Sequence, residues 1–170
     1  MQPKDDLMKG ACCGNARLVL SALRRGASPN ARYQGRTMLL WAVQERHLKV
    51  VKTLVRAGAS LEARDRDGFT AIDQAVGEGR FEIVAFLLKA GANVNGRTTN
   101  GTPLHTACAW RRTRIARLLL EHGADPGLLD RDGRRPVDFI RRTKNVSDKA
   151  LKKILMTADT ALSLSRLPKK

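Results

Sequence analysis

The segment 65–96 carries two runs of apolar positions at helical spacing, with a glycine between them. The first run, over residues 70–76, begins at a threonine, whose hydroxyl can cap free backbone amides. Gly79 ends it, and a longer run follows over residues 81–88. Aspartate and glycine at 65–68 are typical of a turn. The pattern therefore predicts a turn, a short helix, a second turn and a longer helix.

This unit recurs along the chain. Gly-Ala pairs follow one another at spacings of 32, 33 and 32 residues, and a fixed period of this length indicates stacked supersecondary units. Each unit exposes apolar faces that only its neighbours can bury. We expect an all-α solenoid with an extended binding surface rather than a closed catalytic pocket. The pairs are Gly26-Ala27, Gly58-Ala59, Gly91-Ala92 and Gly123-Ala124.

One copy carries a short motif. Residues 101–108 read Gly-Thr-Pro-Leu-His-Thr-Ala-Cys, which resembles the G-T-P-L-H-x-A-A signature of the ankyrin repeat. The resemblance covers about residues 7–140, and second-helix patterns at 48–54, 81–88 and 113–120 agree with it. It implies helix-turn-helix units with short β-hairpin fingers, about four repeats plus a C-terminal capping unit. It also implies a structural role for His105.

The repeat predicts the boundaries. We expect a single ankyrin-repeat domain over residues 1–156 and a basic, partly disordered tail over 157–170. Ser147 is expected to cap a final helix whose inward residues are Ala150, Leu151, Ile154 and Leu155. The units are 7–31, 32–64, 65–96, 97–129 and a partial unit at 130–156.

Two arginines stand where the family has glycine. Gly14 and Gly79 lie between the two helices of their units, and Arg46 and Arg111 take the corresponding places in the other two. Glycine tolerates backbone conformations that other residues avoid. We expect these two turns to be strained or to adopt a different conformation.

The chain is strongly basic, with 32 Lys and Arg against 16 Asp and Glu and a net charge of +16 over 170 residues. The charge is −2 over residues 65–96 and +7 over residues 130–170. Such a balance favours an acidic partner, which could be a protein, a nucleic acid or an anionic membrane surface.

Targeting signals are not apparent. No apolar run approaches the roughly 20 residues of a membrane span, and the first residues lack the apolar core of a secretion signal. The cysteines, Cys12, Cys13 and Cys108, do not form a disulfide framework. We expect an intracellular monomer, in cytoplasm or nucleus; a secreted effector that enters a host cell stays open.

Catalytic groupings are also absent from the sequence. His47, His105 and His122 lie at separate repeat positions, and no metal-ligand spacing joins them to the cysteines. The Asp-x-Asp pairs at 65–67 and 130–132 lie in turns, where aspartate is favoured anyway. We expect no enzymatic activity, cofactor or metal. The Cys12-Cys13 pair could be reactive, although two small apolar residues are the favoured interpretation.

In ankyrin proteins the usual binding surface is the concave one, formed by the hairpin tips and the exposed face of each first helix. On this surface Trp110 is the strongest candidate anchor, with packing on a neighbouring helix as the alternative. Tyr33 and Phe69 could extend an aromatic track, whereas Trp41 is expected to be half-buried packing. The candidate partner-binding residues are Arg32, Tyr33, Gln34, Arg36, Arg64, Arg66, Asp67, Phe69, Glu78, Arg97, Thr99, Trp110, Arg111, Arg131 and Arg134.

The preferred hypothesis is a non-catalytic interaction module (adaptor, inhibitor or scaffold) that binds an acidic protein. The alternative is a nucleic-acid or anionic-lipid binder that uses a basic C-terminal face, itself open to interpretation as a solvated surface. The residues of that face are Arg111, Arg112, Arg114, Arg117, Arg134, Arg135, Arg141, Arg142 and Lys144.

Overall fold

The computed structural model describes residues 2–140 and 146–165, with side chains for residues 2–140 and 149–160. The chain divides into two compact units, Met1–Asn93 and Val94–Lys170. We call them unit 1 and unit 2 and describe each by itself. The single domain expected over residues 1–156 stays a prediction.

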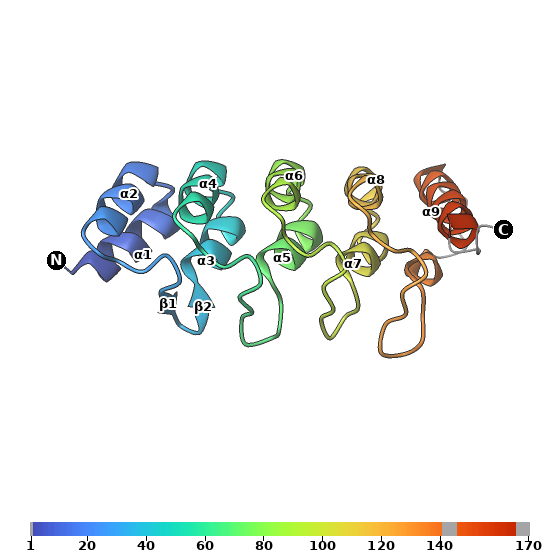
Figure 1. Ribbon diagram of the computed structural model, residues 1–170, viewed down its shortest axis with the longest axis horizontal. Coiled ribbons are helices and arrows are strands. Elements are labelled where there is room, and N and C mark those ends of the chain that lie inside the picture. Colours follow the sequence, from blue (N-terminus) through green and yellow to red (C-terminus); the bar gives the residue numbers. More distant parts are fainter. Residues whose placement is uncertain (1, 141–145, 166–170) are drawn as a thin grey trace. The chain divides into compact units, whose positions relative to one another are not determined.

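Unit 1 is built from three helix pairs. The first helices are α1 (Pro3–Cys13), α3 (Met38–Gln44) and α5 (Ala71–Gly77); the second helices are α2 (Ala16–Arg24), α4 (Leu48–Arg56) and α6 (Phe81–Lys89). Within the unit, the first helices form one layer and the second helices another, and the fingers extend beyond the first-helix layer (Figure 1). Strands β1 (Arg32–Tyr33) and β2 (Arg36–Thr37) form the first finger.

Local signals set the ends of these helices. At the start of α5, the Asp73 carboxylate accepts hydrogen bonds from the Thr70 backbone N–H at 3.0 Å and from its hydroxyl at 2.6 Å, completing a capping box. At the end of α4, Gly58 adopts a φ of 87°, which allows the Ala59 N–H to reach back to the Leu54 carbonyl at 3.0 Å. The Gly-Ala pairs are therefore helix stops.

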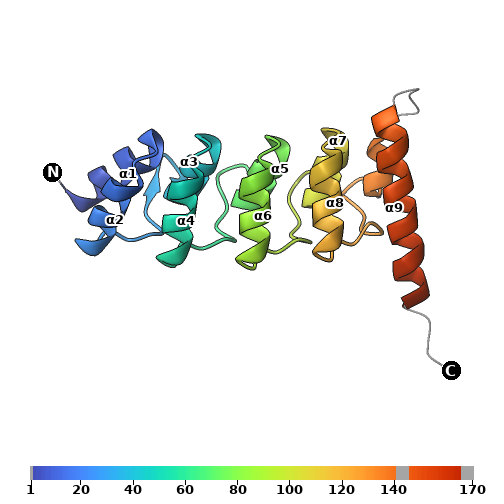
Figure 2. The same cartoon turned by 90° about the horizontal axis from the view of Figure 1, so that it is seen from above.

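The core of unit 1 lies between the two helix layers. Met38, Leu39 and Leu40 on α3 are at most 1% exposed, and Leu54 on α4 and Leu87 on α6 are fully buried. Successive second helices, α2, α4 and α6, run side by side (Figure 2). Burial of one large aliphatic side chain stabilises a fold by about 1.5–3 kcal/mol, so this shared layer holds the repeats of the unit together.

Unit 2 contains α7 (Pro103–Ala109), α8 (Thr113–Glu121), the 3-10 helix η1 (Pro136–Phe139) and α9 (Val146–Ser165). Helix α9 contacts α8 and η1, and Leu151 and Leu155 are at most 1% exposed. This confirms the inward role of these two leucines in a capping helix.

Three details of α9 differ from expectation. Ala150 is exposed, because Leu151 and Leu155, four residues apart, define the buried stripe. Ser147 does not precede the helix, which begins at Val146. The helix also continues to Ser165, so residues 157–165 of the expected tail are helical; residues 166–170 lie outside the described residues.

The predicted fold class, an all-α repeat fold, is confirmed. Among residues 2–140 and 146–165, only the first finger forms β-strands; the finger near Thr98 has a single bridge, Thr98 to Gly101. Arg46 and Arg111 adopt φ values of 63° and 54°, the left-handed conformation of Gly14 and Gly79 at the matching turns. The strained alternative expected for these turns is the one observed. No helix in the described residues combines the length and apolar character needed to cross a bilayer.

Candidate interaction surface

The first finger is a tight hairpin that is tied to the next finger. Gln34 and Gly35 have φ values of 52° and 84°, as a two-residue type I′ turn requires. The Arg32 guanidinium donates to the Gly35 carbonyl at 2.8 Å and to the Arg64 carbonyl at 2.9 Å. The Arg66 side chain lies directly over Gly35, where it leaves no room for a Cβ. Arg32 thus joins two fingers while keeping its charge at an exposed tip.

In the second finger, Asp65 accepts hydrogen bonds from the backbone of its own loop. Asp65 Oδ1 accepts from the Asp67 N–H at 3.1 Å and from the Phe69 N–H at 2.9 Å, and its side chain is only 7% exposed. The Arg64 guanidinium donates to the Gly68 carbonyl at 2.6 Å. Arg66 and Asp67 are exposed at the tip, and Phe69 is half-buried.

Behind the first finger lies an aromatic and arginine cluster. The Arg36 guanidinium carbon is 5.5 Å from the centroid of the Trp41 ring, a cation–π arrangement. Trp41 Nε1 donates to the Tyr33 carbonyl at 3.2 Å, and the two rings are 6.3 Å apart. Trp41 is half-buried, which confirms its expected packing role, whereas Tyr33 is 39% exposed.

Arg36 also begins a polar network on the first helices of unit 1. It donates to Gln44 Oε1 and, at 2.8 Å, to Gln74 Oε1. Gln74 in turn donates to Glu78 at 3.0 Å, and Arg80 forms an ion pair with Glu78 at 3.1 Å. We call Gln44, Arg36, Gln74, Glu78 and Arg80 the Arg36 network. Sequence reasoning missed Gln74, although it stands one repeat after Trp41 and therefore on the same face.

In unit 2, Trp110 is the residue after α7 and is 64% exposed. This exposure contradicts the alternative in which Trp110 packs down on a helix. Arg111 follows it in the left-handed turn and is also exposed. Arg97 and Thr99, around the Thr98 bridge, are exposed as well. A large aromatic ring beside an arginine in solvent is the usual composition of an interface anchor.

The last finger neutralises much of its own charge. Asp130 Oδ1 accepts from the backbone of Asp132 and of Arg134, both at 2.9 Å. The Arg134 guanidinium pairs with both carboxylates and lies 4.7 Å from the Phe139 ring centroid. Arg131 stands exposed at the tip. Both Asp-x-Asp pairs therefore form turns, as expected for that motif.

The basic C-terminal face is only partly described. Among its described members, Arg134 is paired as above, and Arg135 forms an ion pair with Asp159 at 3.4 Å. Arg141, Arg142 and Lys144 lie outside the described residues.

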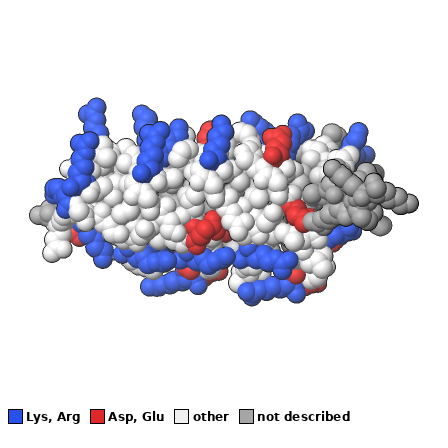
Figure 3. Space-filling model, viewed as in Figure 1, with Lys and Arg blue, Asp and Glu red and all other residues white. Residues whose placement is uncertain are grey.

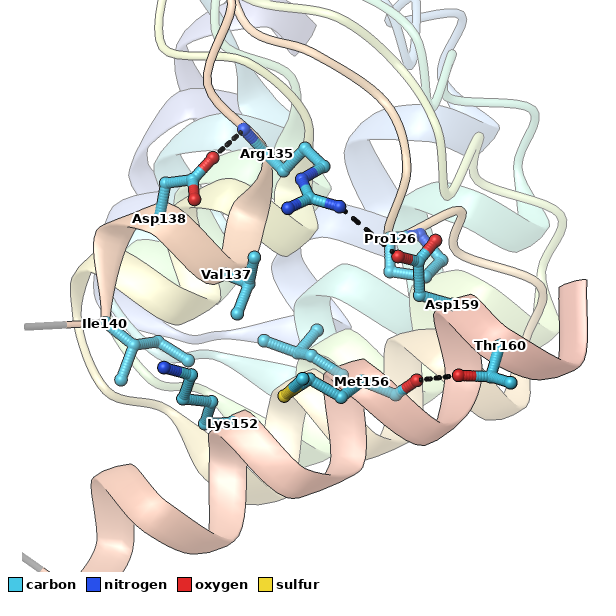
Figure 4. A pocket seen from close by; sticks show the side chains of 10 residues that line it. Pro126, Arg135, Val137, Asp138, Ile140, Lys152, Met156, Asp159 and Thr160 are labelled. Carbon is cyan, nitrogen blue, oxygen red and sulfur yellow. Dashed lines mark hydrogen bonds and ion pairs between the residues drawn. The ribbon is translucent and has the colours of Figure 1, made fainter. Parts of the chain in front are cut away.

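A pocket of about 570 Å³ lies between η1 and α9 (Figure 4). The Arg135–Asp159 ion pair crosses one end of it, and Asp138 accepts from the Arg135 backbone N–H at 2.7 Å. Both carboxylates of the lining are thus engaged by Arg135. It is lined by Pro126, Arg135, Val137, Asp138, Ile140, Lys152, Leu155, Met156, Asp159 and Thr160.

His105 and His47 form hydrogen bonds that hold structural elements together. His105 is fully buried; its Nδ1 accepts from the Thr102 N–H at 3.1 Å and its Nε2 donates to the Arg134 carbonyl at 3.0 Å. Burial is the main cause that lowers the pKa of His105, so the ring stays neutral. His47 Nε2 bonds to the Cys12 carbonyl at 3.0 Å. The structural role expected for His105 is confirmed.

The thiols of Cys12 and Cys108 are not activated. Burial, with a smaller contribution from Cys13, raises the pKa of the Cys12 thiol, and burial raises that of Cys108 to about 12. A raised pKa lowers the thiolate population, which is the reactive form. In the described residues, no group of three or more His, Cys, Asp or Glu side chains could hold a metal ion.

Stacked helix pairs with projecting fingers define a helical repeat protein. A family model for ankyrin repeats in three copies matches residues 7–98 and 61–130, and the chain belongs to the ankyrin-repeat family. It is also 44% identical over 66 residues to ankyrin repeat and SOCS box protein 11 of Danio rerio, a match that covers 39% of this chain. The matched segment spans about a fifth of that relative, 20% of its length. Ankyrin repeats are generally protein-interaction modules and are typically non-enzymatic, which supports a protein-binding role.

Proposed function

We propose that the protein is a non-catalytic adaptor, inhibitor or scaffold that binds an acidic protein surface through its finger side. By finger side we mean the finger tips and the exposed faces of the first helices. In unit 1 these carry Arg32, Tyr33, Gln34, Arg36, Arg64, Arg66, Asp67, Phe69 and Glu78, and in unit 2 Arg97, Thr99, Trp110, Arg111, Arg131 and Arg134.

The observation that carries the proposal is that most arginines on the fingers of unit 1 are exposed, whereas the Asp65 carboxylate is buried. The Asp65 carboxylate is turned into its own loop, pairs with Arg36 at 3.5 Å and is 7% exposed, whereas Arg32, Arg64 and Arg66 are exposed beside one exposed aspartate, Asp67. The arginines that donate to backbone carbonyls keep their full positive charge, and guanidinium groups suit carboxylates because they can bind them in bidentate fashion. An acidic partner would therefore meet cations already held in place.

Pre-organisation supports the same proposal. Stacking on Trp41 and hydrogen bonds to Gln44 and Gln74 hold the Arg36 guanidinium, so less side-chain entropy is lost when a partner binds. In unit 2, the 64% exposed Trp110 supplies apolar area, and burying such an anchor can contribute 2 kcal/mol or more, about a thirtyfold change in affinity.

The free cysteines Cys12, Cys13 and Cys108 agree with a reducing, intracellular location for the proposed monomer. The alternative, a nucleic-acid or anionic-lipid binder that uses the basic C-terminal face, is weakened because Arg134 and Arg135 there are paired with aspartates. That alternative is instead an outcome of the test below.

The test is affinity capture from nuclease-treated and untreated extract with the wild type, Arg66→Glu for unit 1 and Trp110→Ala for unit 2. Arg17→Glu on α2 is the matched charge control. We expect a discrete protein that survives an increase from about 0.15 M to about 0.5 M salt, is lost with the finger-side variants and is kept by the control. Nucleic acid that is equally retained by all variants and released by salt would contradict the proposal.

A further inference from the structure

Unit 1 carries a second basic surface, distinct from the finger side. It is formed by the exposed positions of the second helices α2, α4 and α6, and we call it the second-helix face. Residues 1–93 contain nine Asp and Glu, yet Glu82 is the only acidic residue in these three helices. Figure 3 shows Lys and Arg gathered along the edge where these helices lie. The cations are Arg17, Arg24, Lys49, Lys52, Arg56 and Lys89.

The cations are in register from α2 to α4, whereas on α6 Glu82 stands one repeat after Lys49 and Lys89 one repeat after Arg56. Arg17 and Arg24 are seven residues apart on α2, and Lys49 and Arg56 are seven apart on α4, so each pair shares one face at a separation of about 10 Å. The repeat places Lys49 beside Arg17 and Arg56 beside Arg24, on helices that contact each other at a typical interaxial distance of about 8–10 Å. The result is a two-dimensional grid of positive charge.

Four of these cations have no ion-pair or side-chain hydrogen-bond partner among the described residues. Arg17, Arg24, Lys49 and Arg56 are exposed and form no ion pair or side-chain hydrogen bond there. On the finger side, by contrast, Arg36, Arg80 and Arg134 are each paired with carboxylates. Cations on the second-helix face are therefore available to an external anion without breaking existing bonds.

The apolar and polar residues between the cations indicate which anion fits. Leu20 lies between Arg17 and Arg24 on α2 and is 41% exposed, which favours contact with a lipid interface. The Phe86 ring is covered by the Lys52 ammonium, 5.8 Å from its centroid, so no open aromatic is offered for base stacking. Helices α2, α4 and α6 also contain no Asn or Gln to read base edges. A planar grid suits a planar ligand better than a single polyanion strand.

We propose that the second-helix face of unit 1 docks on the surface of an anionic lipid bilayer. Binding is peripheral: Lys and Arg approach the headgroups, and Leu20 enters the interface. Because the attraction is electrostatic, it weakens as salt rises. The finger side remains free for a protein partner, so this site and the proposed function are independent of each other.

The test is sedimentation of the full chain with vesicles of phosphatidylcholine alone or mixed with phosphatidylserine. The face variant combines Arg17→Gln, Arg24→Gln, Lys49→Gln and Arg56→Gln. A control variant of equal net charge combines Lys4→Gln, Lys9→Gln, Arg46→Gln and Lys153→Gln, all exposed positions outside this face and outside the finger side. Circular dichroism verifies that both variants are folded.

We expect the wild type to bind only the vesicles with phosphatidylserine. Each cation near a charged bilayer contributes about fivefold to partitioning, so the face variant should lose at least about a hundredfold and the control variant much less. Equal losses in the two variants, binding to neutral vesicles, or no binding would overturn the proposal.

A second measurement separates lipid from nucleic acid. Leu20→Gln should weaken vesicle binding while its binding to a short DNA duplex, at the same salt, stays that of the wild type. If the duplex binds through the same four cations and Leu20→Gln leaves vesicle binding unchanged, the face is a general polyanion site, and the membrane proposal is wrong.

Discussion

The Nε2 of His105 donates a hydrogen bond to the carbonyl of Arg134 across 3.0 Å. On its other side, the same ring accepts from the Thr102 N–H at the start of α7. The buried imidazole therefore connects the first helix of unit 2 to its last finger, and it does so only when Nδ1 carries no proton. The backbone carbonyl of Arg134 thus bonds to the ring, while its guanidinium pairs with Asp130 and Asp132.

This geometry predicts acid sensitivity. Burial lowers the pKa of His105 from its ordinary value of 6.5; the hydrogen bond to the Arg134 carbonyl and the charge of Asp130 oppose this effect, and the charges of Arg97 and Arg134 reinforce it. The unfolded chain then binds a proton that the folded chain does not, so this contribution to stability is full above pH 6.5 and is lost as pH falls below it.

Urea unfolding at about pH 7.5 and about pH 5.5 would measure the effect, with His105→Gln as the comparison. We expect the free energy of unfolding of the wild type to fall more between the two values than that of the variant. An equal fall in both proteins would show that His105 does not titrate between them.

Replacing the arginine in a left-handed turn by glycine should stabilise the folded protein. A non-glycine residue in the left-handed region costs about 1–2 kcal/mol, partly offset because glycine gains entropy in the unfolded chain. Arg46→Gly, at a φ of 63°, should therefore raise the free energy of unfolding by about 0.5–1 kcal/mol. Gly79→Arg, the reverse change at the matching turn of α5 and α6, should lower it. A destabilised Arg46→Gly variant would show that the Arg46 side chain has a stabilising role of its own.

Two adjacent residues on α9 should differ strongly in the loss of stability that follows their replacement by alanine. Leu155 is 1% exposed and Met156 is 58% exposed. Leu155→Ala should lower the free energy of unfolding of unit 2 by about 2–5 kcal/mol because it leaves a cavity, and Met156→Ala by less than about 0.5 kcal/mol. Thermal unfolding of the two variants distinguishes them, and similar losses would mean that α9 does not cap the unit as described.

The repeat architecture follows from the sequence because period and helix stops are local signals. Gly-Ala pairs, the threonine caps and the apolar runs each act within a few residues, and the family model for ankyrin repeats agrees with them. The Arg36 network could not be predicted from the sequence in the same way. Arg36 and Gln74 are 38 residues apart and meet only because the repeats stack. The final helix was expected to extend only briefly past Met156, but it continues to Ser165 because no glycine or proline follows until Pro168.

For the candidate site residues too, local features were predictable and contacts between distant residues were not. Exposure of Trp110 could be inferred from its position outside the core register of residues 104–108. The bond from Arg32 to the Arg64 carbonyl could not, because it depends on the close approach of two loops. What the residues at the finger tips bind stays a proposal.

The measurement that tests the finger side most directly is site-specific photo-crosslinking in a membrane-free extract. A photoreactive residue is placed at Arg66 or Trp110 on the finger side, and at Ser21 or Thr53 on the second-helix face. We predict one discrete protein adduct from Arg66 or Trp110 and none from Ser21 or Thr53. The same adduct from all four positions, or from Ser21 and Thr53 alone, would contradict a finger-side protein interaction.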